Sequence, residues 1–140
     1  MKTAVQAGLV TLGALLAGAT VLVAPAQAAT IIQRTAVCHT TDYSGTFTLR
    51  YENDGFDYRI IGGYTASGPY IGDATGTVAL RISYRTGTGT HTVYSQTSPT
   101  TGRTTFTTPT TTTVPTMYTG TAAATFDNGT VSCTATVPIS

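Results

Sequence analysis

The chain has 140 residues, only 9% of them charged, and a formal net charge of +1. Beyond residue 28, six Arg stand against six acidic residues, with no basic run among them. A nucleic-acid-binding protein needs a basic stripe that displaces counterions from phosphates, so we expect no nucleic-acid partner.

The first predicted element is a secretory signal peptide at residues 1–28. Lys2 provides the positive start, an uncharged apolar run follows, and Ala26-Gln27-Ala28 has the small residues that signal peptidase requires. A membrane anchor is the alternative, since the run is about long enough to span a bilayer. Pro25 interrupts it, however, and no positive stop-transfer cluster follows. We expect a secreted, extracellular domain at 29–140, with no stable membrane insertion after cleavage.

Two cysteines, Cys38 and Cys133, lie near the two ends of the predicted domain. Exported proteins fold in an oxidising environment, so an even count favours a disulfide. A bridge between these positions closes a loop of nearly the whole domain. We expect no metal and no cofactor, because two widely separated cysteines without a CxxC motif make a poor zinc site.

The pattern after residue 28 is typical of an all-β protein. Thr accounts for 31 of the 112 residues, and apolar residues alternate with polar ones while no 3.6-residue period persists. The opening strand, 31–40, has adjacent apolar pairs that suggest a bulge. Next comes a hairpin in which Asp54-Gly55 forms a type I′ turn, pairing Tyr51 with Tyr58 and Leu49 with Ile60.

Two further hairpins are predicted downstream. The strand at 78–84 turns through 86–90 into a strand at 91–96. Near the C-terminus, an Asn128-Gly129 turn pairs Phe126 with Val131, which places Cys133 on the apolar face.

The segment 97–121 has a different composition: 14 of its 25 residues are Thr, and it contains three prolines. Proline removes ladder donors, which excludes one central strand. Two alternatives remain, an edge strand plus loop or a partly disordered Thr/Pro tract.

About eight short strands in one domain predict a small antiparallel β-sandwich, immunoglobulin-like in general architecture, with a disulfide joining the first strand to the last. A closed β-barrel is the alternative. The Cys…Trp…Cys signature of true immunoglobulin domains is missing, since the chain has no Trp.

Candidate catalytic groups are sparse. Glu52 and Asp57 are predicted to face each other on the polar side of the first hairpin, as a carboxylate pair for glycoside hydrolysis would. With Arg50 and Arg59 diagonally across, a solvated charge lattice explains the same residues. Two histidines and no nucleophile elbow do not indicate a triad. We therefore expect no catalytic residues and no enzyme.

Three tyrosines, Tyr43, Tyr64 and Tyr70, are the candidate binding residues, because they fall in predicted loops rich in Gly and Ser. The alternative is that they cap the ends of the sandwich. We expect a non-enzymatic binding or inhibitor module whose partner is an extracellular protein or polysaccharide. A structural envelope or extracellular matrix protein is the second hypothesis, and a small hydrolase the third. Abundant Thr, Ala and Gly, with Arg but no Lys after residue 28, is typical of bacterial exported proteins.

Overall fold

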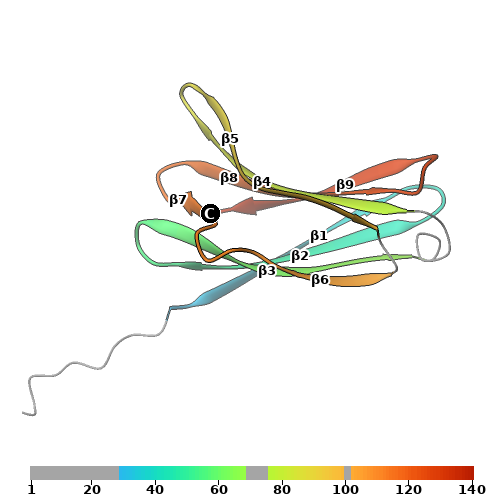
Figure 1. Ribbon diagram of the computed structural model, residues 1–140, viewed down its shortest axis with the longest axis horizontal. Helices are drawn as coiled ribbons and strands as arrows, with labels where there is room; N and C mark the ends of the chain where they lie inside the picture. Colours follow the sequence, from blue (N-terminus) through green and yellow to red (C-terminus); the bar gives the residue numbers. More distant parts are fainter. Residues whose placement is uncertain (1–28, 69–75, 100–101) are drawn as a thin grey trace, which may run out of the picture.

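The computed structural model describes residues 29–68, 76–99 and 102–140, which fold into two packed layers of antiparallel strands (Figure 1). The predicted signal peptide lies outside these ranges. Within them, no helix is long and apolar enough to cross a membrane. The strands, in chain order, are β1 (Ile31–His39), β2 (Ser44–Asn53), β3 (Asp57–Gly68), β4 (Thr77–Thr86), β5 (Gly89–Pro99), β6 (Arg103–Thr107), β7 (Thr113–Pro115), β8 (Thr119–Asp127) and β9 (Ser132–Ile139).

One sheet has the order β1-β2-β3-β6, with β7 also paired to β3, and we call it sheet A. The other, sheet B, has the order β5-β4-β8-β9. Neither sheet closes on itself, so the predicted β-sandwich is confirmed and the barrel alternative is wrong. The tip of the β4–β5 hairpin extends away from the two layers (Figure 1).

The core lies between the sheets and follows from the alternation of side chains along each strand. Alternate residues of β2, β4, β8 and β9 point inward, and most of them are buried. The largest side chains with almost no exposure are Tyr51, Phe47, Phe126, Leu49, Ile60, Ile82 and Ile139. Alanines on β8 and β9 fill the narrower space near the last strand, which lets the two layers approach closely.

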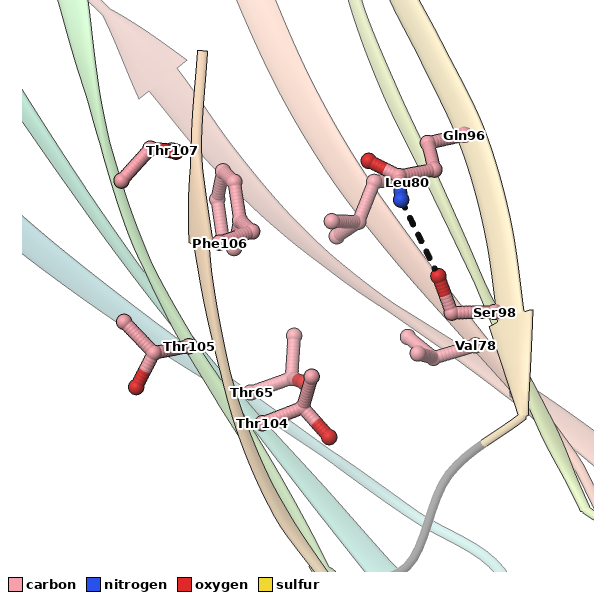
Figure 2. Close-up of a pocket in the computed structure, with 9 residues that line it drawn as sticks. All are labelled: Thr65, Val78, Leu80, Gln96, Ser98, Thr104, Thr105, Phe106 and Thr107. Atoms are coloured by element: carbon pink, nitrogen blue, oxygen red, sulfur yellow. Dashed lines mark hydrogen bonds between the residues drawn. The ribbon is translucent and has the colours of Figure 1, made fainter.

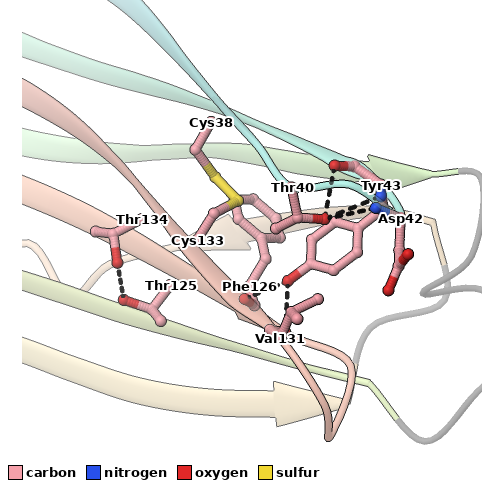
Figure 3. Close-up of a disulfide and its surroundings, with 9 residues drawn as sticks. All are labelled: Cys38, Thr40, Asp42, Tyr43, Thr125, Phe126, Val131, Cys133 and Thr134. Atoms are coloured by element: carbon pink, nitrogen blue, oxygen red, sulfur yellow. Dashed lines mark hydrogen bonds between the residues drawn. A yellow bond between two sulfur atoms is a disulfide. The ribbon is translucent and has the colours of Figure 1, made fainter.

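The disulfide closes one side of the sandwich. Cys38 on β1 and Cys133 on β9 are joined, with 5.8 Å between their Cα atoms (Figure 3). The predicted link between the first and last strands is therefore confirmed. Cys38 is buried and Cys133 packs partly buried against the core, as expected for a structural bridge.

Both predicted hairpin registers are wrong by two residues. Tyr51 pairs with Ile60 rather than Tyr58, and Phe126 pairs with Cys133 rather than Val131. The central residues of the turns are Gly55-Phe56 and Gly129-Thr130, because Asp54 N–H donates to Asp57 O and Asn128 N–H to Val131 O. Since the shift is even, every apolar side chain keeps its predicted face.

The turn type explains this shift. Gly55 and Gly129 have φ of 101° and 89°, and no described non-glycine residue has positive φ. A type I′ turn needs positive φ at both central residues, which excludes it in both hairpins. The Asx side chain before each glycine accepts main-chain N–H groups instead: Asp54 Oδ1 from Phe56, and Asn128 Oδ1 from Thr130.

The bulge predicted in β1 is also wrong, because β1 pairs with β2 residue by residue. Register shifts occur instead beside Arg50, where Ile61 is the extra residue of β3, and beside Ile82, where Val93 is the extra residue of β5. The first of these bulges shapes the surface described below.

The Thr-rich segment contributes the second edge of sheet A, in agreement with the edge strand plus loop. β6 pairs with the second half of β3, and β7 pairs with its first three residues. The loop between them stays attached, since Thr108 Oγ1 donates to Ile60 O at 2.7 Å and Ile60 N–H donates to Thr112 O at 3.0 Å. β6 and β7 therefore run along β3 as one interrupted edge strand.

Candidate functional site

Tyr43, the first predicted binding residue, belongs to the core. It is 4% exposed, and its hydroxyl lies 2.6 Å from Phe126 O and 3.0 Å from Val131 O, to which it donates (Figure 3). Burial raises the pKa of this phenol, with a smaller contribution from the charge of Asp127. Tyr43 is therefore enclosed rather than exposed on a loop, and its hydroxyl secures the β1–β2 connection to the β8–β9 turn.

Tyr64 has the opposite environment. The predicted loop at 62–70 is strand up to Gly68, so Tyr64 lies on β3 rather than in a connection. It pairs with Thr48 on one side and Thr105 on the other. Because its neighbour Thr65 points into the sandwich, Tyr64 lies on the outer face of sheet A, partly exposed. Tyr70 lies outside the described residues.

Two arginines and a glutamine surround Tyr64. The guanidinium carbon of Arg103 stands 4.4 Å from the centre of the Tyr64 ring, a cation–π contact. Arg50, Gln33, Tyr64 and Arg103 all line one open hollow of about 350 Å³. We call these four residues the Tyr64 patch. The four residues come from four different strands, β1, β2, β3 and β6, so the sheet itself fixes the spacing of their backbones.

Two glycines, Gly62 and Gly63, lie between the β3 bulge and Tyr64 and line the same hollow. A Cβ atom on Gly63 would lie 1.9 Å from Thr48 O, and one on Gly62 would lie 2.3 Å from Phe106 O. Side chains are therefore excluded at both positions. Gly62 is the residue opposite Arg50, so no β3 side chain fills the surface between Arg50 and Tyr64.

The charges on the outer face of sheet A are unevenly balanced. Arg59 forms an ion pair with Glu52, the residue directly opposite it on β2. Arg50 and Arg103 form no ion pair with any described residue. The predicted carboxylate pair is therefore not formed, since Glu52 faces Arg59 instead of Asp57. Among the described residues, the Tyr64 patch thus keeps two exposed positive charges without an ion-pair partner.

A second hollow, the edge slot, opens between β6 of sheet A and strands β4 and β5 of sheet B (Figure 2). The disulfide joins the strands at the opposite edges, β1 and β9. It measures about 260 Å³. Its floor is apolar and its rim carries hydroxyl and amide groups, including the Gln96 Nε2 bond to Ser98 Oγ at 3.3 Å. The lining residues are Thr65, Val78, Leu80, Gln96, Ser98, Thr104, Thr105, Phe106 and Thr107. None of these lining residues is charged.

The histidines and acidic residues do not assemble into a reactive group. His91 stacks on Tyr84, with ring centres 5.2 Å apart, at the base of the β4–β5 tip. Asp54 is engaged by the turn main chain, and its N–H partners, Asp57 first and then Phe56, lower the pKa of its carboxyl. In the part of the chain that the structure describes, no three His, Cys, Asp or Glu side chains are grouped to hold a metal ion.

The sequence pattern names Tyr64 as a candidate binding residue but does not indicate the residues that surround it. Arg50 was assigned to a charge lattice, and Arg103 lies in the Thr-rich segment whose strand pairing was left open. The Gly62-Gly63 pair directly before Tyr64 was the available signal, since paired glycines inside a strand often mark a bulge or a close backbone approach. In the sequence analysis, the same two glycines contribute to the prediction of a Gly- and Ser-rich loop.

Comparison with known proteins adds no functional information. No family model matches the chain, and neither a curated protein nor a solved structure matches it. A function for this chain is therefore inferred from the arrangement of its own residues.

Proposed function

We propose that this chain is an exported, non-enzymatic binding module that holds its ligand on the outer face of sheet A, at the Tyr64 patch. One observation carries the proposal: Tyr64, with Arg103 over its ring, shares an open hollow with the unpaired Arg50. Tyrosine and arginine are the residue types that contribute most to recognition surfaces. Here both stand on paired strands, which lowers the entropic cost of ordering them on binding.

The state of the acidic residues supports binding over catalysis. A glycosidase needs two carboxyl groups that flank the substrate. Glu52 is largely buried and paired with Arg59, while Asp54 and Asp127 accept hydrogen bonds from turn N–H groups. These carboxylates stabilise turns and a surface ion pair, and the Tyr64 patch itself has no group that would act as a base.

Export is part of the proposal. Residues 1–28 have the charge, apolar run and cleavage tripeptide of a signal peptide. The Cys38–Cys133 bridge fits an oxidising compartment outside the cytosol. We expect mature protein to begin at Ala29, with intact mass spectrometry giving a mass two protons below the reduced sum.

A binding screen with a matched pair of variants tests the proposed face. The secreted protein, Tyr64→Ala and Tyr118→Ala would be applied to immobilised extracellular polysaccharides and proteins. Tyr118 is a suitable control because it stacks on Tyr84 away from the hollow, with ring centres 5.4 Å apart. We expect a ligand that is lost with Tyr64→Ala and kept with Tyr118→Ala. Equal retention by both variants would contradict the proposed face.

A structural role is the second candidate, and strand β5 favours it. β5 is an 11-residue edge strand without a charged residue, and most of it is exposed. Natural edge strands usually carry charges that prevent pairing with another chain. Self-association through β5 would give concentration-dependent oligomers in analytical ultracentrifugation, and Ser95→Lys would abolish them. A monomer at all concentrations would count against this role.

A further inference from the structure

We infer that the Tyr64 patch recognises the acidic groups of a polysaccharide, carboxylate or sulfate, rather than an uncharged chain. This inference rests on the proposed function and names its ligand class. The two arginines of the patch have no acidic partner among the described residues. Arginine presents a planar fork of N–H donors that matches the two oxygens of a carboxylate or sulfate.

The strand register places both arginines around the same point. Arg50 is opposite Gly62, which precedes Tyr64 by two residues on β3, on the side of the β2–β3 turn. Arg103 is opposite Ala66, which follows Tyr64 by two residues on β3. Diagonal neighbours in a sheet are about 7–8 Å apart, within reach of long side chains. The two arginines are therefore on opposite sides of Tyr64, about twice that distance apart, so an acidic chain lying across the ring can be contacted by one arginine on each side.

Tyr64 prepares one of these contacts in advance. Its ring lies beneath the Arg103 guanidinium, which restricts a side chain that would otherwise sample many rotamers. A cation–π contact leaves the edge donors of the guanidinium free, because the ring occupies only its face. Tyr64 is thus a positioning residue for Arg103 as well as a contact surface.

The uncharged groups of the hollow favour a sugar chain over an acidic protein. The Gln33 amide and the Thr105 and Thr107 hydroxyls line the hollow beside the arginines. Such groups exchange hydrogen bonds with sugar hydroxyls. The hollow is open, whereas strong protein contacts usually centre on anchor side chains inserted into well-packed pockets. A polymer can lie across the sheet and repeat its acidic group beyond the hollow.

The near-neutral chain conceals this site. Its net charge gives no sign of an anion site, because Glu52 is paired with Arg59 and Asp54 and Asp127 bond to turn main chain, while the patch retains two arginines without an ion-pair partner among the described residues. Attraction to a charged polymer falls off over about 8–10 Å at physiological salt, so the local balance decides binding.

Affinity measurements with defined polymers test the inference. Polygalacturonate and dextran sulfate are the acidic probes, dextran is the neutral control, and polyglutamate is the acidic protein control. The double variant Arg50→Gln/Arg103→Gln is compared with Arg81→Gln/Arg85→Gln, which removes the same charge from sheet B. Both pairs involve surface side chains, and equal thermal melting would show that each variant folds.

We expect an acidic polysaccharide to bind, with affinity that falls as salt rises. The Arg50/Arg103 variant should bind roughly 10–100-fold more weakly, the effect of losing a charge-assisted hydrogen bond or two. The Arg81/Arg85 variant should bind within about threefold of the wild type, because it is outside the contact. Tyr64→Phe should retain most of the affinity, since the ring under Arg103 remains.

The contrary outcomes separate this inference from the proposed function. A neutral polysaccharide that binds as tightly as the acidic ones, and is lost only with Tyr64→Ala, would overturn the inference and leave the binding face intact. Polyglutamate binding equal to that of the acidic polysaccharides would overturn the ligand class. Equal losses from both arginine pairs would show a general charge effect and refute the site. Failure of every probe to bind would also refute the inference, while other ligands in the screen could still support the proposed face.

Discussion

Tyr43 and Tyr64 are the same residue type at two depths of the sandwich, and their surroundings determine what each can do. The hydroxyl of Tyr43 is enclosed and bonded to two main-chain carbonyls. Tyr64 is partly exposed, with its ring engaged by Arg103. A tyrosine in a Gly- and Ser-rich sequence suits either role, so the sequence pattern alone could not distinguish a core tyrosine from a surface one.

Removing the Tyr43 hydroxyl should destabilise the fold. Tyr43→Phe leaves Phe126 O and Val131 O without their side-chain donor at a buried site. We expect the free energy of unfolding to fall by about 1–2 kcal/mol. Urea denaturation measures this, with Tyr118→Phe as a control near the wild-type value. An unchanged midpoint for Tyr43→Phe would contradict the assigned role.

Asp54 should titrate below an ordinary aspartate. Its Oδ1 accepts hydrogen bonds from the N–H groups of Asp57 at 2.8 Å and Phe56 at 3.0 Å, which lower its pKa. A depressed pKa contributes stability above the unfolded value of about 3.9, and that contribution is lost as pH falls through the lower folded value.

An NMR titration checks this behaviour directly. The amide protons of Phe56 and Asp57 should shift together with the Asp54 carboxyl, with a midpoint below about 3.9. Asp54→Asn should remove that titration from both amides. A midpoint at or above the ordinary value would show that the turn does not favour the carboxylate.

The strand is the scale at which sequence reasoning was most successful. Alternation identified the β2–β3, β4–β5 and β8–β9 hairpins, and the apolar faces predicted for the first and last of them are the buried ones. The registers were wrong because an Asx side chain bonding its own turn competes with the type I′ geometry, and both choices keep the same parity. Bulges escaped prediction, since one extra residue depends on cross-strand contacts rather than on local composition.

Gly63, two residues beyond the extra residue of the β3 bulge, should tolerate no side chain. Gly63→Ala places a methyl group against Thr48 O, where the backbone must move. We expect a loss of about 2–4 kcal/mol, and weaker ligand binding because the hollow closes. Gly87→Ala is the control, because a Cβ there meets nothing within 4 Å. Equal melting of the two variants would disprove the close approach between Gly63 and the Thr48 main chain.

At the scale of the whole molecule, the disulfide and the edge slot make the two sides of the sandwich different. The bridge links β1 to β9 across a sequence separation of 95 residues. The opposite side has no such link among the described residues, and there the slot opens between the layers. The sequence predicted the bridge because only one pairing was possible. The slot and the Tyr64 patch depend on how strands meet across the sheets, and this was not predictable from the pattern.

Removing the disulfide measures how much it stabilises its side of the sandwich. Cys38→Ala with Cys133→Ala releases a loop of nearly the whole domain and should cost about 2–5 kcal/mol. Because the strand pairing does not depend on the bridge, we expect the variant to keep its fold at low temperature and to melt earlier. Calorimetry measures the change. A melting temperature within a degree or two of the wild type would show that the bridge adds little.

The location of the bound ligand is the most direct test of the central claim, that the outer face of sheet A is the binding face. Isotope-labelled protein would be titrated with short oligogalacturonates, and the amide shifts mapped on the sandwich. We predict the largest shifts around Gln33, Arg50, Tyr64 and Arg103, with sheet B unchanged. Shifts centred instead on the edge slot, near Gln96 and Ser98, or on the outer face of sheet B would contradict it.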